Sequence, residues 1–315
     1  MRIDVHAHYY PNAMIKRAER LGADLSAVRR ISLASEERAD LEARLKMMDE
    51  AGVDMQALSV SSTQPYYERE SDAVDAARES NDLYAELVER YPKRFAAFAA
   101  LPLPHVDAAM KELERALDQL KMVGVTIGTS VVSRSAAEEA FEPVYAEMNR
   151  RGCALFVHPA GLGVCSPLLR DFQLTWVCGA PFEDTMFALH IIRRQIPQRY
   201  PKIKIIVPHL GGAIPVLYTR IDSTKPMFAA QNAEPPTTTL KRLWYDCVAQ
   251  NNTAALKCAV ATLGADRLVY GSDYPYQLHA EYLNSVKYVQ QSGLPKADID
   301  KILDQTAARL LGLAG

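Results

Sequence analysis

The sequence lacks the segments that would place it in a membrane or on a nucleic acid. None of its 315 residues belongs to an uninterrupted apolar stretch of about 18 residues, the length of a membrane-spanning helix. There is no basic run, and 36 lysines and arginines against 38 aspartates and glutamates leave a formal net charge of -2. Such a balanced charge gathers neither phosphates nor anionic lipid. We therefore expect no nucleic acid and no membrane as partner.

Cysteine is scarce, and the five cysteines contain no C-x-x-C pair. An odd number without that spacing suits reduced thiols better than a disulfide or zinc-ribbon framework. Met1 leads directly into a strand-like run, with no charged and then apolar segment of the kind that directs secretion. We expect a cytoplasmic protein. Because no linker or low-complexity segment interrupts the chain, we also expect a single domain over residues 1–315.

Eight short apolar runs alternate with longer helical patterns along the chain. This alternation is typical of βα units around a parallel sheet, and eight units predict a (β/α)8 TIM barrel. The runs are Ile3–His8, Met55–Val60, Phe95–Ala100, Gly124–Gly128, Ala154–His158, Ile203–Pro208, Leu243–Cys247 and Leu268–Gly271. The expected helices are Glu36–Ala51, Ser71–Tyr91, Asp107–Lys121, Ala136–Arg151, Glu183–Gln195, Thr253–Thr262, Ala280–Gln291 and Lys296–Leu311.

Two connections are longer than a barrel requires. They are Tyr9–Ser35 after the first strand and Pro159–Phe182 after the fifth. Both follow the carboxyl ends of strands, where barrels build active sites, so we expect loop insertions that form pocket walls. In a third irregular stretch, 226–239, Pro235 and Pro236 disfavour a helix.

Four of the seven histidines fall at the ends of expected strands. His6 and His8 are two residues apart, so both imidazoles face the same side of the sheet. His158 ends the fifth strand, His209 directly follows the sixth, and Asp273 lies two residues after the end of the eighth. All of them belong at the carboxyl mouth of a barrel. For the other three histidines, a surface or packing role is the default; they are His105, His190 and His279.

Three histidines and an aspartate from this set would satisfy one divalent ion and leave a position for water or substrate. Zn²⁺ is the first expectation, with Mn²⁺ and Co²⁺ as alternatives. A simpler interpretation is that these residues are buried, hydrogen-bond one another and bind no ion. Another is that the ion has a purely structural role in a non-catalytic barrel.

Motifs along almost the whole chain resemble the amidohydrolase superfamily. They are Asp4-Val5-His6-Ala7-His8, His158-Pro159, His209-Leu210-Gly211-Gly212 and Gly271-Ser272-Asp273-Tyr274-Pro275. Further segments are similar to its 2-amino-3-carboxymuconate-6-semialdehyde decarboxylase branch, namely Met48–Val53, Gln56–Ser59, Val123–Thr129, Trp176–Pro181 and Ala307–Leu313.

The resemblance implies roles for individual residues. The ion would be held by His6, His8, His158 and Asp273, with His209 as an acid/base that does not bind it. A single metal is implied, because the fourth strand ends in Ile127-Gly128-Thr129-Ser130 without a bridging lysine. Catalysis would rest on His209 and Asp273.

The resemblance also implies how substrate is bound. Arg44 and Arg220 would bind a substrate carboxylate, and without the resemblance each would be a solvated surface charge. Arg220 would reach a neighbouring subunit's site, which implies a homodimer or higher oligomer. Trp176 would pack on a flat conjugated substrate, although ordinary loop packing explains it equally well. Asp184 would orient the Trp176 loop or be a solvated carboxylate at a helix start.

The expected activity is the non-oxidative decarboxylation of a small conjugated or aromatic carboxylic acid. The ion would activate water and orient the substrate, and His209 would relay the proton to the carbon that loses carbon dioxide. The alternative is a metal-dependent hydrolase or hydratase that acts on a carboxylate-bearing intermediate of aromatic degradation.

Overall fold

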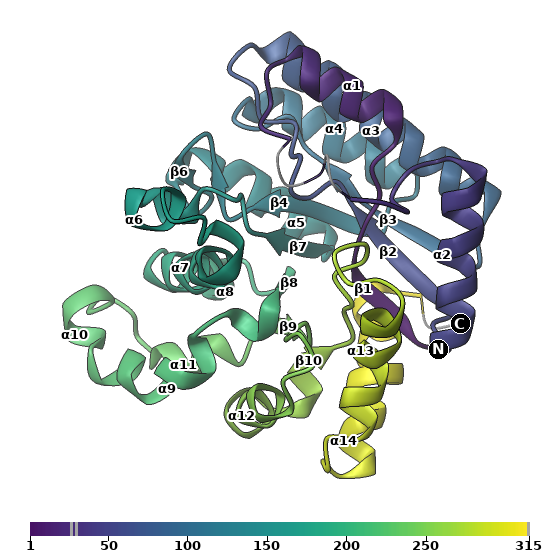
Figure 1. The fold of residues 1–315 in the computed structure, drawn as a ribbon. Coiled ribbons are helices and arrows are strands. Elements are labelled where there is room, and N and C mark those ends of the chain that lie inside the picture. Colours follow the sequence, from purple (N-terminus) through teal and green to yellow (C-terminus); the bar gives the residue numbers. More distant parts are fainter. Residues whose placement is uncertain (26–27, 29–30, 314–315) are drawn as a thin grey trace.

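The computed structural model describes residues 1–25, 28 and 31–313, and its centre is one sheet of eight parallel strands surrounded by helices (Figure 1). The strands neighbour one another in chain order and are β1 (Ile3–His8), β2 (Met55–Ser59), β3 (Phe95–Ala100), β4 (Gly124–Gly128), β7 (Ala154–His158), β8 (Lys204–Val207), β9 (Trp244–Asp246) and β10 (Leu268–Val269). This arrangement confirms the (β/α)8 barrel. A small hairpin, β5 (Ser130–Val131) and β6 (Arg134–Ser135), follows β4.

Main-chain hydrogen bonds join the last strand and the segment after it to β1. The amide of Val5 donates to Tyr270 O at 3.0 Å, and the amide of Asp273 donates to His6 O at 2.8 Å. The amide of His8 then donates to Tyr274 O at 2.7 Å. The chain after β10 therefore runs beside β1, which places Asp273 next to the two N-terminal histidines.

Helices cover the outside of the sheet, as Figure 1 shows. The longer ones are α1 (Asn12–Arg20), α2 (Arg38–Ala51), α3 (Glu70–Arg90), α4 (Val106–Asp118), α5 (Glu142–Arg151), α7 (Ala180–Arg193), α9 (Ile214–Ser223), α12 (Thr253–Leu263) and α13 (Ala280–Gln290). The shorter ones are α6 (Pro167–Arg170), α8 (Ile196–Arg199), α10 (Lys225–Phe228), α11 (Pro236–Leu240), α14 (Lys296–Asp300) and α15 (Thr306–Leu311).

Three expectations about helices were wrong. The helix expected from Ala136 begins at Glu142, because the chain turns after the hairpin and a 3-10 helix occupies Glu139–Phe141. The expectations omitted α1, inside the first long connection, and α9, the helix after β8. The stretch 226–239 was expected to lack helix, yet α11 begins at Pro236. Proline is tolerated in the first turn of a helix, where its missing N–H would have no partner inside the helix.

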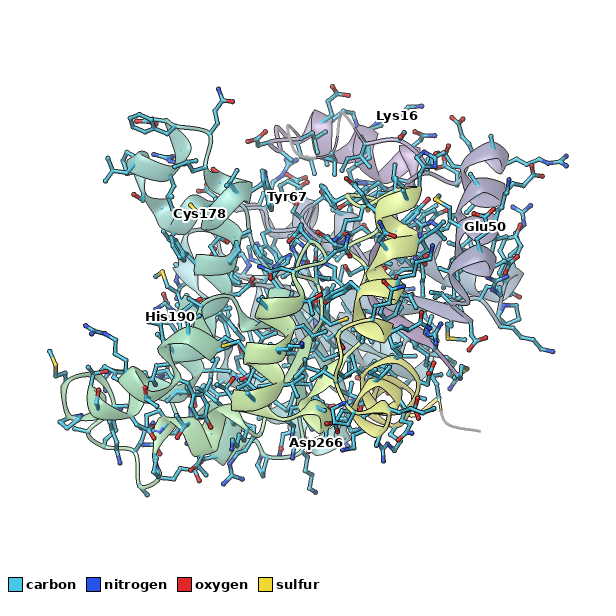
Figure 2. The ribbon with its side chains drawn as sticks, turned by 60° about the horizontal axis from the view of Figure 1, so that its bottom comes forward. Lys16, Glu50, Tyr67, Cys178, His190 and Asp266 are labelled. Atoms are coloured by element: carbon cyan, nitrogen blue, oxygen red, sulfur yellow. The ribbon has the colours of Figure 1, made fainter. Side chains whose placement is uncertain are left out.

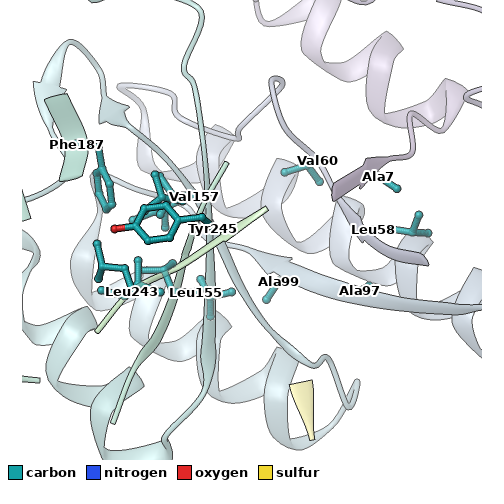
Figure 3. Close-up of a cluster of buried hydrophobic side chains, with 14 of the residues drawn as sticks. Ala7, Leu58, Val60, Ala97, Ala99, Leu155, Val157, Phe187, Leu243 and Tyr245 are labelled. Carbon is teal, nitrogen blue, oxygen red and sulfur yellow. The ribbon is translucent and has the colours of Figure 1, made fainter. Parts of the chain in front are cut away.

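The core lies mainly between the strands and the helices around them. Figure 3 shows part of it, with Leu155 and Val157 of β7 near Phe187 of α7 and Tyr245 of β9. Side chains alternate along a strand, so Phe156 and His158 point to the opposite face, where Phe156 packs 5.0 Å from the His6 ring. The packing of apolar side chains on one face therefore fixes the direction of His158 on the other.

Charged side chains cover the outer helices, as Lys16 on α1 and Glu50 on α2 show in Figure 2. Among the helices of the described residues, none has the length and apolar character needed to cross a bilayer. All five cysteines are free; Cys247 is buried, while Cys153 is half-buried and directly precedes β7. Residues 26–27 and 29–30 of the first expected loop, and 314–315 at the end of the expected single domain, lie outside the described residues.

Candidate metal centre

Four side chains from three parts of the chain meet at the carboxyl ends of the strands. His6, His8, His158 and Asp273 each offer one ligand atom, and these atoms all lie within 4.8 Å of one another. All four side chains are largely or fully buried, and Asp273 is the most accessible at 9% exposure. Imidazole nitrogens and a carboxylate oxygen at this spacing form a site for one divalent ion.

The contacts inside this cluster leave one nitrogen without a hydrogen bond. Asp273 Oδ1 lies 3.2 Å from His6 Nε2 and 3.3 Å from His8 Nε2. Despite the short distance, His6 Nε2 is buried and makes no hydrogen bond of acceptable geometry to any residue that the structure describes. A buried nitrogen without a partner is costly, and a bound cation would satisfy it. The donor set and this nitrogen therefore fit a metal ion.

Each histidine of the cluster is held through its other ring nitrogen. His6 Nδ1 lies 2.6 Å from Asp246 Oδ2, and His8 Nδ1 lies 3.1 Å from Ser59 Oγ. His158 Nδ1 lies 3.0 Å from Pro159 O. Bonds of this kind orient metal-binding imidazoles and direct their Nε2 atoms into the site. Sequence reasoning did not identify Asp246, although a carboxylate inside the apolar run Leu243–Cys247 was a usable signal.

The charges around the cluster favour a cation. Burial lowers the pKa of His8 to about 4 and holds the pKa of His158 well below its usual value, so both rings are neutral, as ligands must be. Burial opposes a charge on His6 as well, but Asp246 and Asp273 outweigh it and raise the pKa of His6 to about 10. Two carboxylates thus stabilise a positive charge at the place where a divalent ion would bind.

A buried aspartate fastens the Asp273 segment to β1. Asp4 accepts hydrogen bonds from the amide of His6 at 3.1 Å and the amide of Ser272 at 2.9 Å. It also accepts from the Ser272 hydroxyl and from Gln56 Nε2, the latter at 3.0 Å. Burial raises the pKa of Asp4 to about 6, although these hydrogen bonds act to lower it. Asp4 therefore holds together the two chain segments that supply His6 and Asp273.

His209 lies beside the four-ligand cluster. Its ring centroid is 5.3 Å from that of His6, and its Nε2 is 4.0 Å from Asp273 Oδ2. Its Nδ1 lies 2.8 Å from Asp184 Oδ2, on α7. Burial opposes protonation of His209, but Asp184 outweighs it and raises the pKa of His209. The position suits an acid/base that faces the same space as the ion.

Asp184 corrects an expectation. It is fully buried, so it is not a solvated helix-start carboxylate, and its partner is His209 rather than the Trp176 loop. Burial raises the pKa of Asp184 to about 7, although His209 acts in the opposite direction. The expected position near a helix start was right, since α7 begins at Ala180. However, only one face of a helix start is exposed to solvent, and Asp184 lies on the buried face.

Arg44 is not a surface charge. Only 1% of the residue is exposed, and its guanidinium donates to His8 O and, at 3.4 Å, to Gln56 Oε1. The guanidinium also lies over the Tyr274 ring, 4.2 Å from its centroid. These contacts place Arg44 among the residues that support β1, and its expected contact with a substrate carboxylate stays a prediction.

Trp176 and Arg220 lie outside the cluster. The Trp176 ring packs on Gly161, three residues after His158, where an added Cβ would lie 2.7 Å from the ring. Trp176 is 42% exposed, so part of the indole remains open to a ligand. Arg220 is exposed on α9.

The other three histidines lie outside the cluster as well. His105 bonds Tyr67 O, and His190 (labelled in Figure 2) bonds Ser135 Oγ. His279 is exposed.

The turn that carries His209 packs tightly on α7. Gly212 has φ +62°, and a Cβ there would lie 2.0 Å from Pro181 O and 2.6 Å from Thr185 Oγ1. We predict that Gly212→Ala lowers the free energy of unfolding by about 1–3 kcal/mol, the usual cost of overpacking, and lowers kcat because the turn must move. Urea unfolding and turnover would measure both effects. Gly22→Ala is the control, because Gly22 has a similar φ of +77° and a Cβ added there meets no atom of the described residues within 4 Å.

Eight parallel strands with three histidines and an aspartate converging at their carboxyl ends define the class of barrel metalloenzymes that use a single ion. Residues 3–313 match the family model described as Amidohydrolase. The chain therefore belongs to the amidohydrolase family.

Its relatives include several decarboxylases. It is 29% identical over 244 residues to 2-amino-3-carboxymuconate-6-semialdehyde decarboxylase from Dictyostelium discoideum, which covers 76% of this chain and 67% of that protein. It is 28% identical over 306 residues to 6-methylsalicylic acid decarboxylase from Penicillium expansum. This match covers 94% of this chain and 91% of that protein. The crystal structure of 2,6-dihydroxybenzoate decarboxylase from Rhizobium superposes on this chain with a TM-score of 0.85 at 22% sequence identity. The superposition covers 100% of this chain and 99% of that chain, which shows that the two share a fold.

Proposed function

We propose that this chain is a metal-dependent decarboxylase of a small conjugated or aromatic carboxylic acid. The observation that carries the proposal is His209, which faces Asp273 from beside a complete set of four ligands without being needed as a fifth. The relatives named above support the carboxy-lyase reaction, whereas none of those names supports the hydrolase or hydratase alternative.

The ion is proposed to be Zn²⁺, with Mn²⁺ or Co²⁺ as alternatives, held by His6, His8, His158 and Asp273. Nitrogen and oxygen ligands accept all three ions, so availability competes with affinity. The related dihydroxybenzoic acid decarboxylase from Polaromonas has a solved structure with bound manganese, which keeps Mn²⁺ in consideration. When bound, the ion would supply Lewis-acid polarisation and a fixed point for the substrate.

The residues of this chain would carry the proton. In decarboxylation the carbon–carbon bond to the carboxylate breaks, carbon dioxide leaves, and the conjugated system takes up the electron pair. A proton must then be bonded to the carbon that lost the carboxylate. His209 Nε2 faces the cluster and is proposed first to take up a proton from solvent and then to deliver it to this carbon. Asp273 would orient the reacting group through the oxygen 4.0 Å from His209.

The test of the proposed function is carbon dioxide release from a panel of acids. The panel contains the substrates named for the relatives: 2-amino-3-carboxymuconate semialdehyde, 6-methylsalicylate and 2,6-dihydroxybenzoate. We expect at least one conjugated acid to lose carbon dioxide with the metal-loaded protein and none with His158→Ala. A product heavier than its substrate by one water, with no carbon dioxide, would contradict the proposal and indicate a hydratase or hydrolase.

We further propose that the active unit is a homodimer or higher oligomer in which Arg220 binds the carboxylate of a substrate in the neighbouring subunit. Arg220 and Val216 are four residues apart on α9, so they share one face of the helix. Val216 is 79% exposed, and other strongly exposed apolar side chains lie on α6, on α10 and in the segment 171–179 between α6 and α7. They are Leu168, Phe172, Val177 and Met227. Exposed apolar surface of this kind supports a protein interface.

Hybrid oligomers test this role of Arg220. Arg220→Ala is expected to lower kcat/KM about 10–100-fold, the usual value of a charge-assisted hydrogen bond. Co-expressed with His158→Ala, it should recover about a quarter of wild-type activity, because half of the dimers are hybrids with one intact site. Arg38→Ala, on exposed α2, is the control for loss of a surface charge. No recovery in the hybrids, or a fully active monomer, would exclude action across an interface.

A further inference from the structure

Asp184 is a buried carboxylate whose one side-chain partner among the described residues is His209. None of its surface is exposed, and its Oδ2 lies 2.8 Å from His209 Nδ1. Its other oxygen, Oδ1, has no hydrogen-bond partner in the described part of the chain. A buried carboxylate with so few partners is costly, and an apolar residue of similar size would stabilise the fold at least as well. Stability alone therefore does not explain this carboxylate.

One face of α7 holds the His209 turn through three contacts. Pro181, Asp184 and Thr185 have the i, i+3, i+4 spacing of a single helix face. Pro181 O is close to Gly212, and Thr185 Oγ1 accepts from the amide of Ala213 at 2.8 Å. Asp184 lies between these two contacts, so its distance to His209 is set by the packing of the helix and not by a free side-chain rotation.

The chemistry of the pair determines which nitrogen of His209 carries hydrogen. In its ionised form, the carboxylate of Asp184 only accepts hydrogen bonds, so His209 Nδ1 then donates to it. The amide of His209 donates to Asp246 Oδ1 at 2.9 Å, which fixes the backbone from the other side. His209 Nε2 is then left to face Asp273 and the metal site.

We propose that Asp184 is a positioning residue that keeps the hydrogen on Nδ1 of His209 and so reserves Nε2 for proton transfer at the metal site. This inference rests on the proposed acid/base role of His209. It extends that role by naming the group that selects the working tautomer. A ring without this acceptor could place its only hydrogen on Nε2, and Nε2 would then have no free lone pair to take up the proton that it later delivers.

Nitrogen-15 NMR of histidine-labelled protein reads the tautomer without any substrate, with His209→Ala to assign the resonances. At a pH at which His209 is neutral, we expect its hydrogen on Nδ1 in the wild type. In Asp184→Ala and Asp184→Asn we expect a substantial population with hydrogen on Nε2, and a kcat about 10²–10³-fold lower at unchanged KM and metal content. The matched control is Glu183→Gln, the adjacent buried carboxylate, which bonds Thr129 and the amide of Ala160 and should leave the His209 tautomer unchanged.

A second comparison separates positioning from a merely structural role. In a His209→Ala background, Asp184→Ala should add less than about a threefold loss, because residues that act as a unit are not additive. An equal loss in both backgrounds, or an unchanged tautomer in Asp184→Ala, would overturn the proposal. A changed tautomer in a protein that releases no carbon dioxide from any acid would support the positioning by Asp184 and refute the proposed decarboxylase.

Discussion

Replacing His209 by alanine is expected to lower kcat about 10²–10⁴-fold, the range typical of a lost general acid or base, while the protein keeps one equivalent of metal. The reason is geometric. His209 lies beside the four ligands with its Nε2 4.0 Å from Asp273, so its removal deletes a proton carrier without deleting a ligand. Metal analysis of the purified variant, paired with carbon dioxide release under single-turnover conditions, measures both quantities.

The control for this variant is His190→Ala. His190 is on the same helix as Asp184 but bonds Ser135 Oγ, so its loss should leave both metal content and kcat close to wild type. Full activity of His209→Ala would remove the proposed proton carrier. Loss of metal from His209→Ala would instead mean that this ring is a ligand and that the four-residue set is incomplete.

Asp273→Ala and His158→Ala are expected to lose both the ion and more than about 10³-fold of the activity, because each removes one of the four candidate ligands found among the described residues. Chelator treatment of the wild type should reproduce the loss of activity. Zn²⁺, Mn²⁺ and Co²⁺ added back separately should then identify the working ion. Titration calorimetry of the chelated protein measures the affinities.

Asp246→Asn provides a graded comparison for the ligand variants. Asp246 bonds His6 Nδ1 at 2.6 Å without being a ligand, so its loss should weaken metal binding by about 10–100-fold rather than abolish it. Thermal unfolding would show that each variant is folded. Asp273→Ala protein that binds one equivalent of metal with wild-type affinity would contradict the assignment of the site.

The sequence by itself determined the barrel and the positions of its polar strand ends. The eight apolar runs correspond to the eight strands, because local periodicity and strand length depend on neighbouring residues only. His6 and His8 share a face for the same local reason. Their convergence with His158 and Asp273 followed from topology, since parallel strands in a barrel end at one mouth.

Only the tertiary structure decided how these residues are held. The partner of His6 is 240 positions away at Asp246, and the partner of His209 is at Asp184 on a different βα unit. Arg44 has the pattern of a surface charge in sequence, yet the fold buries it beneath His8. Contacts of this kind depend on which helix packs on which turn, and a pattern read along one segment carries no information about a partner supplied by another.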